Sequence, residues 1–347
     1  MINNPVRVGV IGVGAMGLHH ARNYSELSQA QLVAVADPDA ARVAQVAERF
    51  GCTPYSDYRE MIAREHLEAV SVAVPTSLHH RIAMDVIRAG VHTLVEKPIT
   101  STIAQAEEMT AASHTHSVLL QVGHVERFNP AVQELKRRMK SGELGQVSSI
   151  IARRVGVMPP RVKDVDVILD LAVHDIDVVR YLLDDDPIEV RATAGSALLS
   201  KNRRDHSEIF LSFGQVSCFL QANWITPIKI RTLSVTSDAA HVELNYVTQR
   251  LDIYQSTLQR SHDDFGDFVV RFGTPQTIAV DSTPQEPLRL ELQSFMQAVR
   301  GKGQVIVTGE EGTKTLQVVE RIKCSLLKKD ERYIELGVLN GTSYVTS

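Results

Sequence analysis

The stretch VRVGVIGVGAMG, residues 6–17, decides the fold of this chain. Its first half is mostly apolar, as in a buried parallel strand, and its second half is a G-x-G-x-x-G pattern that opens a helical segment. Gly12 permits a tight turn, Gly14 lets the backbone approach a pyrophosphate, and Gly17 lets the helix pack close to the strand. The N–H groups at the start of the helix would face the phosphates. Residues 12–17, hereafter the glycine loop, predict a dinucleotide-binding turn. The alternative is a tight turn that binds no ligand.

An acidic residue follows at the spacing that this kind of site requires. Asp37 ends the next apolar run, twenty residues after Gly17. A carboxylate there accepts hydrogen bonds from an adenosine ribose and repels a 2′-phosphate, so the sequence favours NAD over NADP. Arg42 lies close enough in sequence to keep NADP open. The structural alternative is an aspartate that begins the turn Asp37-Pro38-Asp39 and caps the following helix.

Short apolar runs and longer helical patterns alternate through residues 6–130. The apolar runs are rich in β-branched residues, suit buried parallel strands, and lie at 6–14, 32–37, 69–75, 91–98 and 118–124. Helical patterns lie between and after them, at 16–27, 39–50, 77–90, 102–115 and about 130–140. This alternation predicts a doubly wound parallel sheet.

After residue 146 the pattern changes to strands with partial alternation. They are expected at 147–157, 188–198, 207–213, 216–225, 230–237, 240–246 and 249–255, with hairpin connections at FGQV (213–216) and TSDAAH (236–241). Helices are expected at 172–183, 287–300 and 309–328. We therefore predict a mostly antiparallel sheet interrupted by one helix, while 256–286 fits strands, a loop over the cleft, or both.

Composition restricts the classes of partner. The chain is 44% hydrophobic and 22% charged, and its net charge of −4 gives no electrostatic reason to propose a nucleic acid. No apolar run after the glycine loop approaches the roughly 18 residues of a membrane span, and we predict a cytoplasmic protein without a membrane partner. Cys52, Cys218 and Cys324 are too far apart for a zinc or redox motif, so we interpret them as buried reduced thiols. No His, Cys, Asp and Glu group has metal-ligand spacing, and no metal is predicted.

A second motif narrows the class of enzyme. Glu96, Lys97 and Pro98 come at the end of a later strand of the predicted parallel sheet. The chain resembles the glucose–fructose oxidoreductase/inositol dehydrogenase family (Gfo/Idh/MocA) in the glycine loop, AVPTSLHH (73–80), VEKPIT (95–100) and LDLAVHDID (169–177). The resemblance covers most of the chain. Ala172 stands where members usually carry glycine, a departure that concerns only the local backbone geometry.

This resemblance implies an α/β fold of two domains. The first is an N-terminal Rossmann domain with a doubly wound parallel sheet over 1–125, which binds NAD. The second is a C-terminal α/β domain over 126–347, with a large open, mostly antiparallel sheet, and the helix at 309–328 can pack back on the first domain. The exposed sheet commonly forms the oligomer interface in such proteins, so a homodimer or homotetramer is expected.

The resemblance further implies NAD-linked oxidation of a secondary hydroxyl of a sugar or polyol, with Lys97, Asp170 and His174 in the catalytic positions. It also implies cofactor contacts from Gly12, Gly14, Ala15, Met16, Gly17, Asp37, Pro75, Thr76, His79, Glu96, Lys97 and Arg127.

The chemistry of the catalytic set is consistent with that activity. Asp170 and His174 are four residues apart and would face the same side of a helix. Histidine has the pKa suited to take a proton from the hydroxyl as hydride leaves carbon, and the aspartate could hold its tautomer. The Lys97 ammonium would favour the developing alkoxide.

A structural interpretation of the same residues is also open. Asp170 could cap the helix, with Asp175 and Asp177 favouring its start. Asp177 and Arg180, three residues apart, are interpreted as a surface pair. The other histidines without a constellation are interpreted as surface or packing residues; they are His19, His20, His66, His92, His114, His116 and His241.

Two segments point to a substrate class. GHVERFNPAV (123–132) and the region 150–177 resemble the family branch that oxidises the 3-hydroxyl of UDP-N-acetylglucosamine to a 3-keto sugar nucleotide. Such a ketone is typically passed to an aminotransferase that makes a diamino sugar for lipid A or another surface glycan. The candidate substrate contacts are Lys97, His124, Glu126, Asn129, Arg153, Arg154, Arg161 and His174.

A nucleotide-sugar diphosphate needs cations. Arg153, Arg154, Arg161 and Lys163 supply a cluster just before the catalytic helix, and arginine suits phosphate oxygens because its planar fork can bind two at once. The alternative is a solvated basic strand end paired with the acidic region 164–177. Two other functions stay open: a dehydrogenase of a free polyol or hexose such as myo-inositol, and a non-catalytic NAD-sensing regulatory protein.

Overall fold

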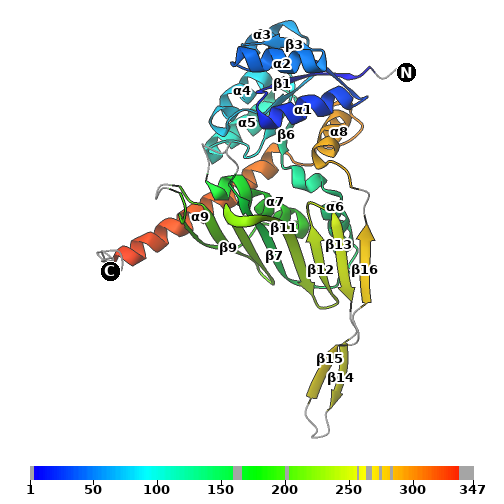
Figure 1. Ribbon diagram of the computed structural model, residues 1–347, viewed down its shortest axis with the longest axis vertical. Helices are drawn as coiled ribbons and strands as arrows, with labels where there is room; N and C mark the ends of the chain where they lie inside the picture. Colours follow the sequence, from blue (N-terminus) through cyan, green and yellow to red (C-terminus); the bar gives the residue numbers. More distant parts are fainter. Residues whose placement is uncertain are drawn as a thin grey trace. The chain divides into compact units, whose positions relative to one another are not determined.

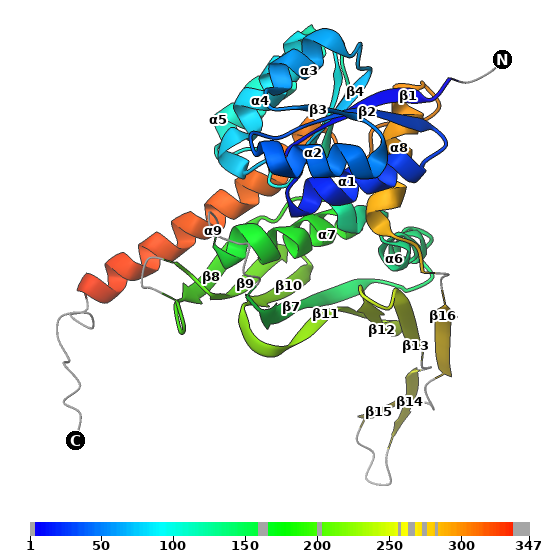
Figure 2. The ribbon, with the colours of Figure 1, turned by 45° about the horizontal axis from the view of Figure 1, so that its top comes forward.

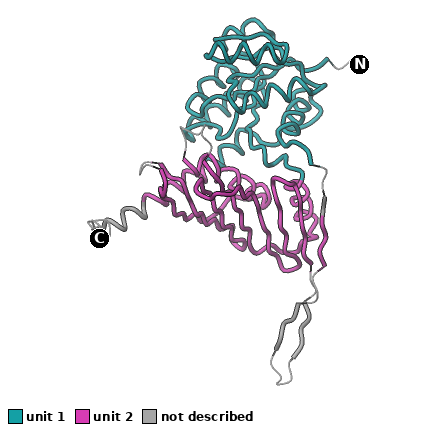
Figure 3. The backbone as a smooth tube through the Cα atoms, in the orientation of Figure 1, with its two compact units in different colours: residues 1–130, 284–316 teal, residues 131–283, 317–347 magenta. Residues whose placement is uncertain are grey.

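The computed structural model (Figure 1, Figure 2) describes residues 4–158, 166–199, 203–255, 258–262, 268–272, 276–281 and 284–335. The chain divides into two compact units (Figure 3): unit 1 contains residues 1–130 and 284–316, and unit 2 contains 131–283 and 317–347. The sequence predicts one division, after residue 125, whereas the structure also assigns 284–316 to the first unit. The reason is a helix in that segment whose apolar side chains, Leu292 and Phe295 among them, complete the core of unit 1.

A six-stranded parallel sheet organises unit 1 in the order β3-β2-β1-β4-β5-β6. Its strands are β1 (Val6–Ile11), β2 (Ala30–Ala36), β3 (Thr53–Tyr55), β4 (Ala69–Val72), β5 (His92–Glu96) and β6 (Leu120–Gly123). All neighbouring strands run parallel, which confirms the predicted doubly wound sheet. The chain reverses its lateral direction between β1 and β4, and ligands of such sheets bind at this switch point, beyond the carboxyl ends of the strands.

Helices cover both faces of this sheet. One face packs against α1 (Ala15–Glu26), α2 (Ala40–Phe50) and α8 (Pro287–Val299). The other face packs against α3 (Tyr58–Arg64), α4 (Thr76–Arg88), α5 (Ile103–Thr115) and the first turns of α9 (Gly309–Glu335). The sequence did not predict β3 and α3, because a three-residue strand that contains proline and a seven-residue helix carry little periodic signal.

The glycine loop places α1 in direct contact with the end of β1. A Cβ atom built on Gly17 would lie 1.7 Å from the carbonyl oxygen of Gly12. Gly12 itself has φ +83°, and a Cβ there would lie 2.6 Å from the Ala73 carbonyl oxygen. Gly14 differs, because a Cβ there would meet no atom within 4 Å. Gly12 and Gly17 are therefore required by packing, and Gly14 is not.

Unit 2 is built on an eight-stranded sheet in the order β16-β13-β12-β11-β7-β10-β9-β8. Its strands are β7 (Val147–Val157), β8 (Glu189–Gly195), β9 (His206–Phe213), β10 (Val216–Asn223), β11 (Ile225–Ser237), β12 (Ala240–Asn245), β13 (Arg250–Gln255) and β16 (Gln276–Asp281). The β7–β10 pair is parallel and the other pairs are antiparallel, as the prediction of a mostly antiparallel sheet requires. The predicted hairpins at 213–216 and 236–241 are both present.

One face of this sheet carries helices and the other is open. The helices α6 (Pro130–Lys140) and α7 (Val173–Leu183) lie on one face (Figure 2), where they share a core with the later turns of α9. A separate two-stranded sheet, β14 (Leu258–His262) with β15 (Phe268–Phe272), precedes β16. Strands therefore occupy the described parts of 256–281.

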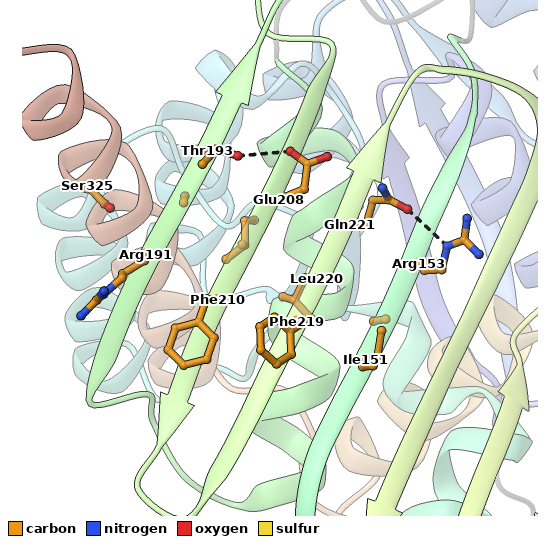
Figure 4. A pocket seen from close by; sticks show the side chains of 13 residues that line it. Ile151, Arg153, Arg191, Thr193, Glu208, Phe210, Phe219, Leu220, Gln221 and Ser325 are labelled. Carbon is orange, nitrogen blue, oxygen red and sulfur yellow. Dashed lines mark hydrogen bonds between the residues drawn. The ribbon is translucent and has the colours of Figure 1, made fainter. Parts of the chain in front are cut away.

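The open face is apolar around a shallow hollow. The side chains of Ile151, Phe210 and Phe219 project from the open face of the sheet and line this hollow (Figure 4). Ile151 and Phe219 remain 46% and 49% exposed. The two phenylalanine rings pack at a centroid distance of 5.2 Å, and the hollow that they line has a volume of about 560 Å³. The open sheet predicted for the second domain is thus confirmed.

Two further sequence expectations concern the surface. Cys218 is buried, but Cys52 is only partly buried and Cys324 is exposed, so the prediction of three buried thiols was wrong. Of the helices that the structure describes, none combines the length and apolar character that a membrane crossing needs.

The contrast between Gly17 and Gly14 predicts different effects on stability. Gly17→Ala should lower the free energy of unfolding by about 1–3 kcal/mol or more, because the new methyl group meets a backbone oxygen that cannot move without shifting the loop. Gly14→Ala is the matched control, since its extended backbone and open surroundings accept a methyl group. Urea unfolding of the two variants and the parent chain measures the difference; equal stability of both variants would contradict the packing argument.

Candidate active site

The predicted cofactor residues of unit 1 lie along one edge of its sheet. Because all six strands are parallel, the segments that follow them meet at the carboxyl edge. The glycine loop follows β1, Asp37 follows β2, Pro75 and Thr76 follow β4, Glu96 ends β5 with Lys97 directly after it, and His124 follows β6. The structure therefore brings the predicted set of this unit together.

Asp37 links the end of β2 to the glycine loop. Its carboxylate is 7% exposed and accepts the Val13 amide at 2.9 Å and the Asp39 amide at 3.0 Å. The Arg42 guanidinium lies 3.4 Å from the same carboxylate. Asp39, rather than Asp37, caps the next helix by accepting the Arg42 amide. Each carboxylate oxygen can accept more than one hydrogen bond, so the group retains capacity for ribose hydroxyls.

The start of α1 fits a dinucleotide phosphate. Gly14 is the N-cap residue, makes no side-chain cap hydrogen bond, and leaves open space where a Cβ would stand. Ala15 and Met16 form the first helical positions, and the first turn has no acidic side chain that would repel a phosphate. Unsatisfied N–H groups and the positive end of the helix dipole favour an anion there. The residues present thus suit the NAD pyrophosphate.

His79 has a different environment from the one expected of a cofactor contact. It is 1% exposed, and its two ring nitrogens lie 2.9 Å from the Pro98 and Val74 carbonyl oxygens. Burial lowers the pKa of His79, against the opposing effect of those carbonyls, so the ring is neutral at neutral pH. The neutral ring has one N–H and can donate to only one of these two carbonyls at a time, so His79 packs between the segments after β4 and β5.

Glu96 has a partner that the sequence analysis missed. The His20 ring on α1 lies 2.9 Å from the Glu96 carboxylate, and both groups are buried. Burial raises the pKa of Glu96, but the hydrogen bond and charge of His20, together with Lys97, outweigh it and lower the pKa overall. His20 was interpreted as a surface or packing residue. The available signal was its position three residues after Gly17, on the side of the helix that meets the sheet.

The predicted substrate segment after β6 folds into a short turn, η1 (Val125–Phe128). His124 and Asn129 are 2% and 1% exposed, and the side-chain amide of Asn129 donates to the Glu126 carboxylate at 3.2 Å. Arg127 is 3% exposed and donates to the Glu311 carboxylate at 2.9 Å. Arg127 therefore ties this segment to the start of α9. Glu126 is the most accessible of the four predicted site residues here, which are His124, Glu126, Arg127 and Asn129.

The predicted catalytic pair of unit 2 lies on one continuous helical path. Asp170 belongs to a π-helical turn, η2 (Ile168–Ala172), and His174 to the first turn of α7; both side chains are partly exposed. The cap is Asp166, whose carboxylate accepts the Ile168 and Leu169 amides at 3.1 and 3.2 Å. The structural interpretation of Asp170 as an N-cap was therefore wrong. Isolated π turns inside helices frequently occur at functional sites.

The two neighbouring arginines of β7 point to opposite faces of the sheet. Arg154 is 5% exposed, forms a two-bond ion pair with Asp175 of α7 at 2.9 and 3.0 Å, and lies 4.8 Å from the Tyr246 ring centroid. Arg153 is on the open face, where it donates to Gln221 at 3.2 Å (Figure 4). The predicted cluster of both arginines on one side does not form, because successive strand residues alternate between faces.

Other predictions for this region also need correction. Asp177 and Arg180 are 1% and 4% exposed, so they are not a surface pair, and Arg180 donates to Asp186 at 2.6 Å. Arg161 and Lys163, the remaining members of the predicted cationic cluster, lie outside the described residues. In the part of the chain that the structure describes, no group of three or more His, Cys, Asp or Glu residues could hold a metal ion.

The buried His79 predicts a dependence of stability on pH. Its folded pKa is lowered by burial from about 6.5, so below that pH the unfolded chain binds more protons and the free energy of unfolding falls as the pH falls. The fall continues until the pH passes the folded pKa. His79→Gln should reduce the slope between pH 7 and 5 in denaturant titrations, whatever its constant effect on stability at pH 8. Parallel curves for the two proteins would contradict this assignment.

The two arginines of β7 predict a second contrast. Arg154→Ala leaves Asp175 buried without its ion pair, which should lower the free energy of unfolding by about 3–5 kcal/mol. Arg153→Ala, one residue away on the open face, should change it by about 0.5 kcal/mol or less. Urea unfolding compares the variants. Similar losses at both positions would show that the assignment of faces is wrong.

Comparison with known proteins identifies the family. Residues 6–124 match the model described as "Oxidoreductase family, NAD-binding Rossmann fold", and residues 132–243 match the "GFO/IDH/MocA C-terminal domain". An oxidoreductase of Agrobacterium radiobacter, solved with NAD+, L-tartaric acid and magnesium, shares the fold with a TM-score of 0.79 at 18% identity, over 93% of this chain and 97% of that chain.

Two relatives of different substrate class are similar along almost their whole length. UDP-N-acetylglucosamine 3-dehydrogenase of Acidithiobacillus ferrooxidans is 29% identical over 323 residues, 92% of this chain and 97% of that protein. Its solved structure has a TM-score of 0.81 at 27% identity, over 94% and 98% of the two chains. The scyllo-inositol 2-dehydrogenase (NAD(+)) of Bacillus subtilis is 28% identical over 335 residues, 91% and 93% of the two chains. This chain therefore belongs to the Gfo/Idh/MocA family of oxidoreductases, with an NAD-binding Rossmann domain at its N-terminal end.

Proposed function

We propose that this protein uses NAD to oxidise the 3-hydroxyl of UDP-N-acetylglucosamine, giving the 3-keto sugar nucleotide. The observation that carries the proposal is the similarity over 92% of this chain and 97% of a relative with that activity. A ketone on the ring of an amino sugar is a substrate for an aminotransferase, which would add a second amino group. The product would thus enter diamino-sugar synthesis for lipid A or another surface glycan. A nucleotide-sugar substrate also agrees with a cytoplasmic location.

In this proposal three residues of the chain carry the proton chemistry. NAD, when bound, supplies the hydride acceptor. His174 takes the hydroxyl proton as the C–H bond breaks, and Asp170, one turn before it, holds the imidazole and stabilises its protonated form. Lys97 places a positive charge near the oxygen on which negative charge develops. Asp166 caps the helix, so the Asp170 carboxylate is not required for capping.

Several side chains support these groups without touching substrate in the proposal. The Arg154–Asp175 ion pair anchors α7 to β7 at the residue that follows His174, and Arg154 also packs on Tyr246, just after β12. Arg154 is therefore assigned to position the catalytic helix, rather than to bind the diphosphate. Among the predicted substrate contacts, His124, Glu126 and Asn129 after β6 remain the candidates for the sugar.

A second function has an observation in its favour. The inositol dehydrogenase of Bacillus subtilis is 28% identical over 91% of this chain, and neither Arg153 nor Arg154 is placed to recognise a diphosphate beside His174. A free polyol or hexose, such as an inositol, would need no such cations. A non-catalytic NAD sensor is disfavoured, because Lys97, Asp170 and His174 are all present.

We also propose that the protein is a homodimer or homotetramer that uses the open face of unit 2. Ile151 and Phe219 remain about half exposed there, around an apolar hollow on an otherwise complete sheet. Exposed apolar patches of this kind mark interaction sites more often than ordinary surface.

The substrate can be identified by trapping the product. Oxidation of an alcohol by NAD is often unfavourable at neutral pH, so hydroxylamine should be added to convert the ketone to an oxime, which mass spectrometry detects. We expect an oxime from UDP-N-acetylglucosamine and none from N-acetylglucosamine, UDP-glucose or myo-inositol. An oxime from myo-inositol alone would overturn the nucleotide-sugar proposal in favour of the polyol alternative.

Matched variants test the catalytic assignment in the same assay. His174→Ala should reduce the rate by about 10²–10⁴-fold while NAD still binds, because the variant loses only the proton acceptor. His80→Ala removes a partly exposed histidine that pairs with Glu108 and should turn over at the rate of the parent protein. NAD binding by fluorescence separates loss of chemistry from loss of the fold; an unchanged rate in His174→Ala would exclude that residue as the base.

A further inference from the structure

A chain of buried polar side chains connects α1 to the end of β5. The Tyr24 hydroxyl lies 2.8 Å from the Ser71 hydroxyl oxygen, and Ser71 lies 3.1 Å from Nδ1 of His20. Nε2 of His20 lies 2.9 Å from Oε1 of Glu96. Tyr24, Ser71 and His20 have no exposed surface, and Glu96 is 7% exposed. We call these four residues the α1 network.

All hydrogen bonds of the α1 network can form together, with each group donating to the next from Tyr24 to Glu96. With its proton on Nε2, the neutral His20 ring donates to Glu96 and accepts from Ser71, which in turn accepts from Tyr24. If His20 is protonated, it still donates to Glu96 through the same nitrogen. In either state the buried carboxylate receives a charge-assisted hydrogen bond from α1, and such bonds are the stronger kind.

The second oxygen of Glu96 acts on the next residue. Oε2 accepts the backbone amide of Lys97 at 3.2 Å. On its other side, Glu96 packs against Gly123 of β6, where a Cβ atom would come within 3.2 Å of the carboxylate carbon and of Oε1. The carboxylate is thus held by His20, by the Lys97 amide and by the closeness of β6, and its orientation is restricted from three sides.

We propose that His20 is a positioning residue: through Glu96 it holds the backbone of Lys97 in a fixed relation to the helix that receives the cofactor pyrophosphate. The catalytic consequence rests on the function proposed above, in which Lys97 acts on the reacting oxygen. Removing the His20 donor leaves a buried carboxylate with one hydrogen-bond donor fewer, which favours movement of the Glu96 side chain and of the amide that it holds. A displacement of about 1 Å in such a group can cost about 100-fold in rate.

Three substitutions separate positioning from folding. His20→Gln retains an amide that can reach Glu96, whereas the shorter amide of His20→Asn can reach Ser71 but not Glu96. Glu96→Gln keeps the shape of the side chain and removes its charge. We expect His20→Asn to lower kcat by about tenfold or more with KM for NAD changed by about threefold or less, and His20→Gln to recover most of the rate.

Hydrogen exchange gives a readout that does not need a substrate. The Lys97 amide is protected by its bond to Glu96, so a peptide that spans residues 94–101 should exchange faster in His20→Asn than in the parent chain or in His20→Gln. Exchange elsewhere in α1 serves as the internal control for general unfolding. Equal exchange of this peptide in all three proteins would overturn the proposal, as would equal kcat values for His20→Asn and His20→Gln.

The double variant tests the path through Glu96. If His20 acts by way of that carboxylate, His20→Asn should change exchange and kcat much less in the Glu96→Gln background than in the parent protein. Additive effects would contradict the proposal. If the parent protein turns over none of the four trial substrates, the proposed function fails, and the exchange data alone then decide the role of His20.

Discussion

The close approach of α1 to β1 is the constraint on which the architecture of unit 1 depends. Gly17 stands where a methyl group would reach within 1.7 Å of the Gly12 carbonyl oxygen, so the helix begins directly against the strand end. That contact places the first N–H groups of α1 at the carboxyl edge of the sheet, where Asp37 and Lys97 also lie. It also directs His20 and Tyr24 into the sheet, where they meet Ser71 and Glu96. One backbone contact therefore sets both the phosphate site and the support of the Lys97 segment.

The two units use the same kind of buried polar contact to hold the helices that carry the candidate site residues. In unit 1 the His20–Glu96 pair connects α1 to β5, and in unit 2 the Arg154–Asp175 pair connects α7 to β7. Both pairs are buried, where an unpartnered charge is costly and a partnered one restricts geometry. Apolar packing alone would tolerate a small rotation of either helix. A directional hydrogen bond tolerates it much less, which suits the proposed roles of His174 and Lys97.

Much of the fold could be predicted from the sequence because its strands are strongly apolar and its glycines have a specific spacing. The five longer strands of the parallel sheet and the seven of β7–β13 were expected within a few residues of their observed positions. The residues at the strand ends followed from topology, since parallel strands share a carboxyl edge. In contrast, the π turn around Asp170 has no sequence signature, and the capping role of Asp166 became visible only with the backbone in place.

The errors at individual residues have physical causes. Arg153 and Arg154 were treated as one cluster, although strand alternation alone sends neighbours to opposite faces. The charges of Asp177 and Arg180 suggested a surface position, but both side chains are on the buried side of α7. The hydrogen bond between His20 and Glu96 joins residues 76 positions apart in sequence, and local spacing cannot reveal such a partner.

The interrupted path of the chain has a consequence for synthesis. Unit 1 needs α8, whose Leu292 and Phe295 complete one of its cores, yet the residues of unit 2 from 131 to 283 are made before that helix. As the polypeptide emerges from the ribosome, one face of the parallel sheet therefore carries only α1 and α2, without α8, while the entire eight-stranded sheet is added. Early folding of the N-terminal segment, common in multidomain chains, cannot be completed here. The nucleotide-binding unit is the first to begin and must wait until the residues up to 316 have been synthesised.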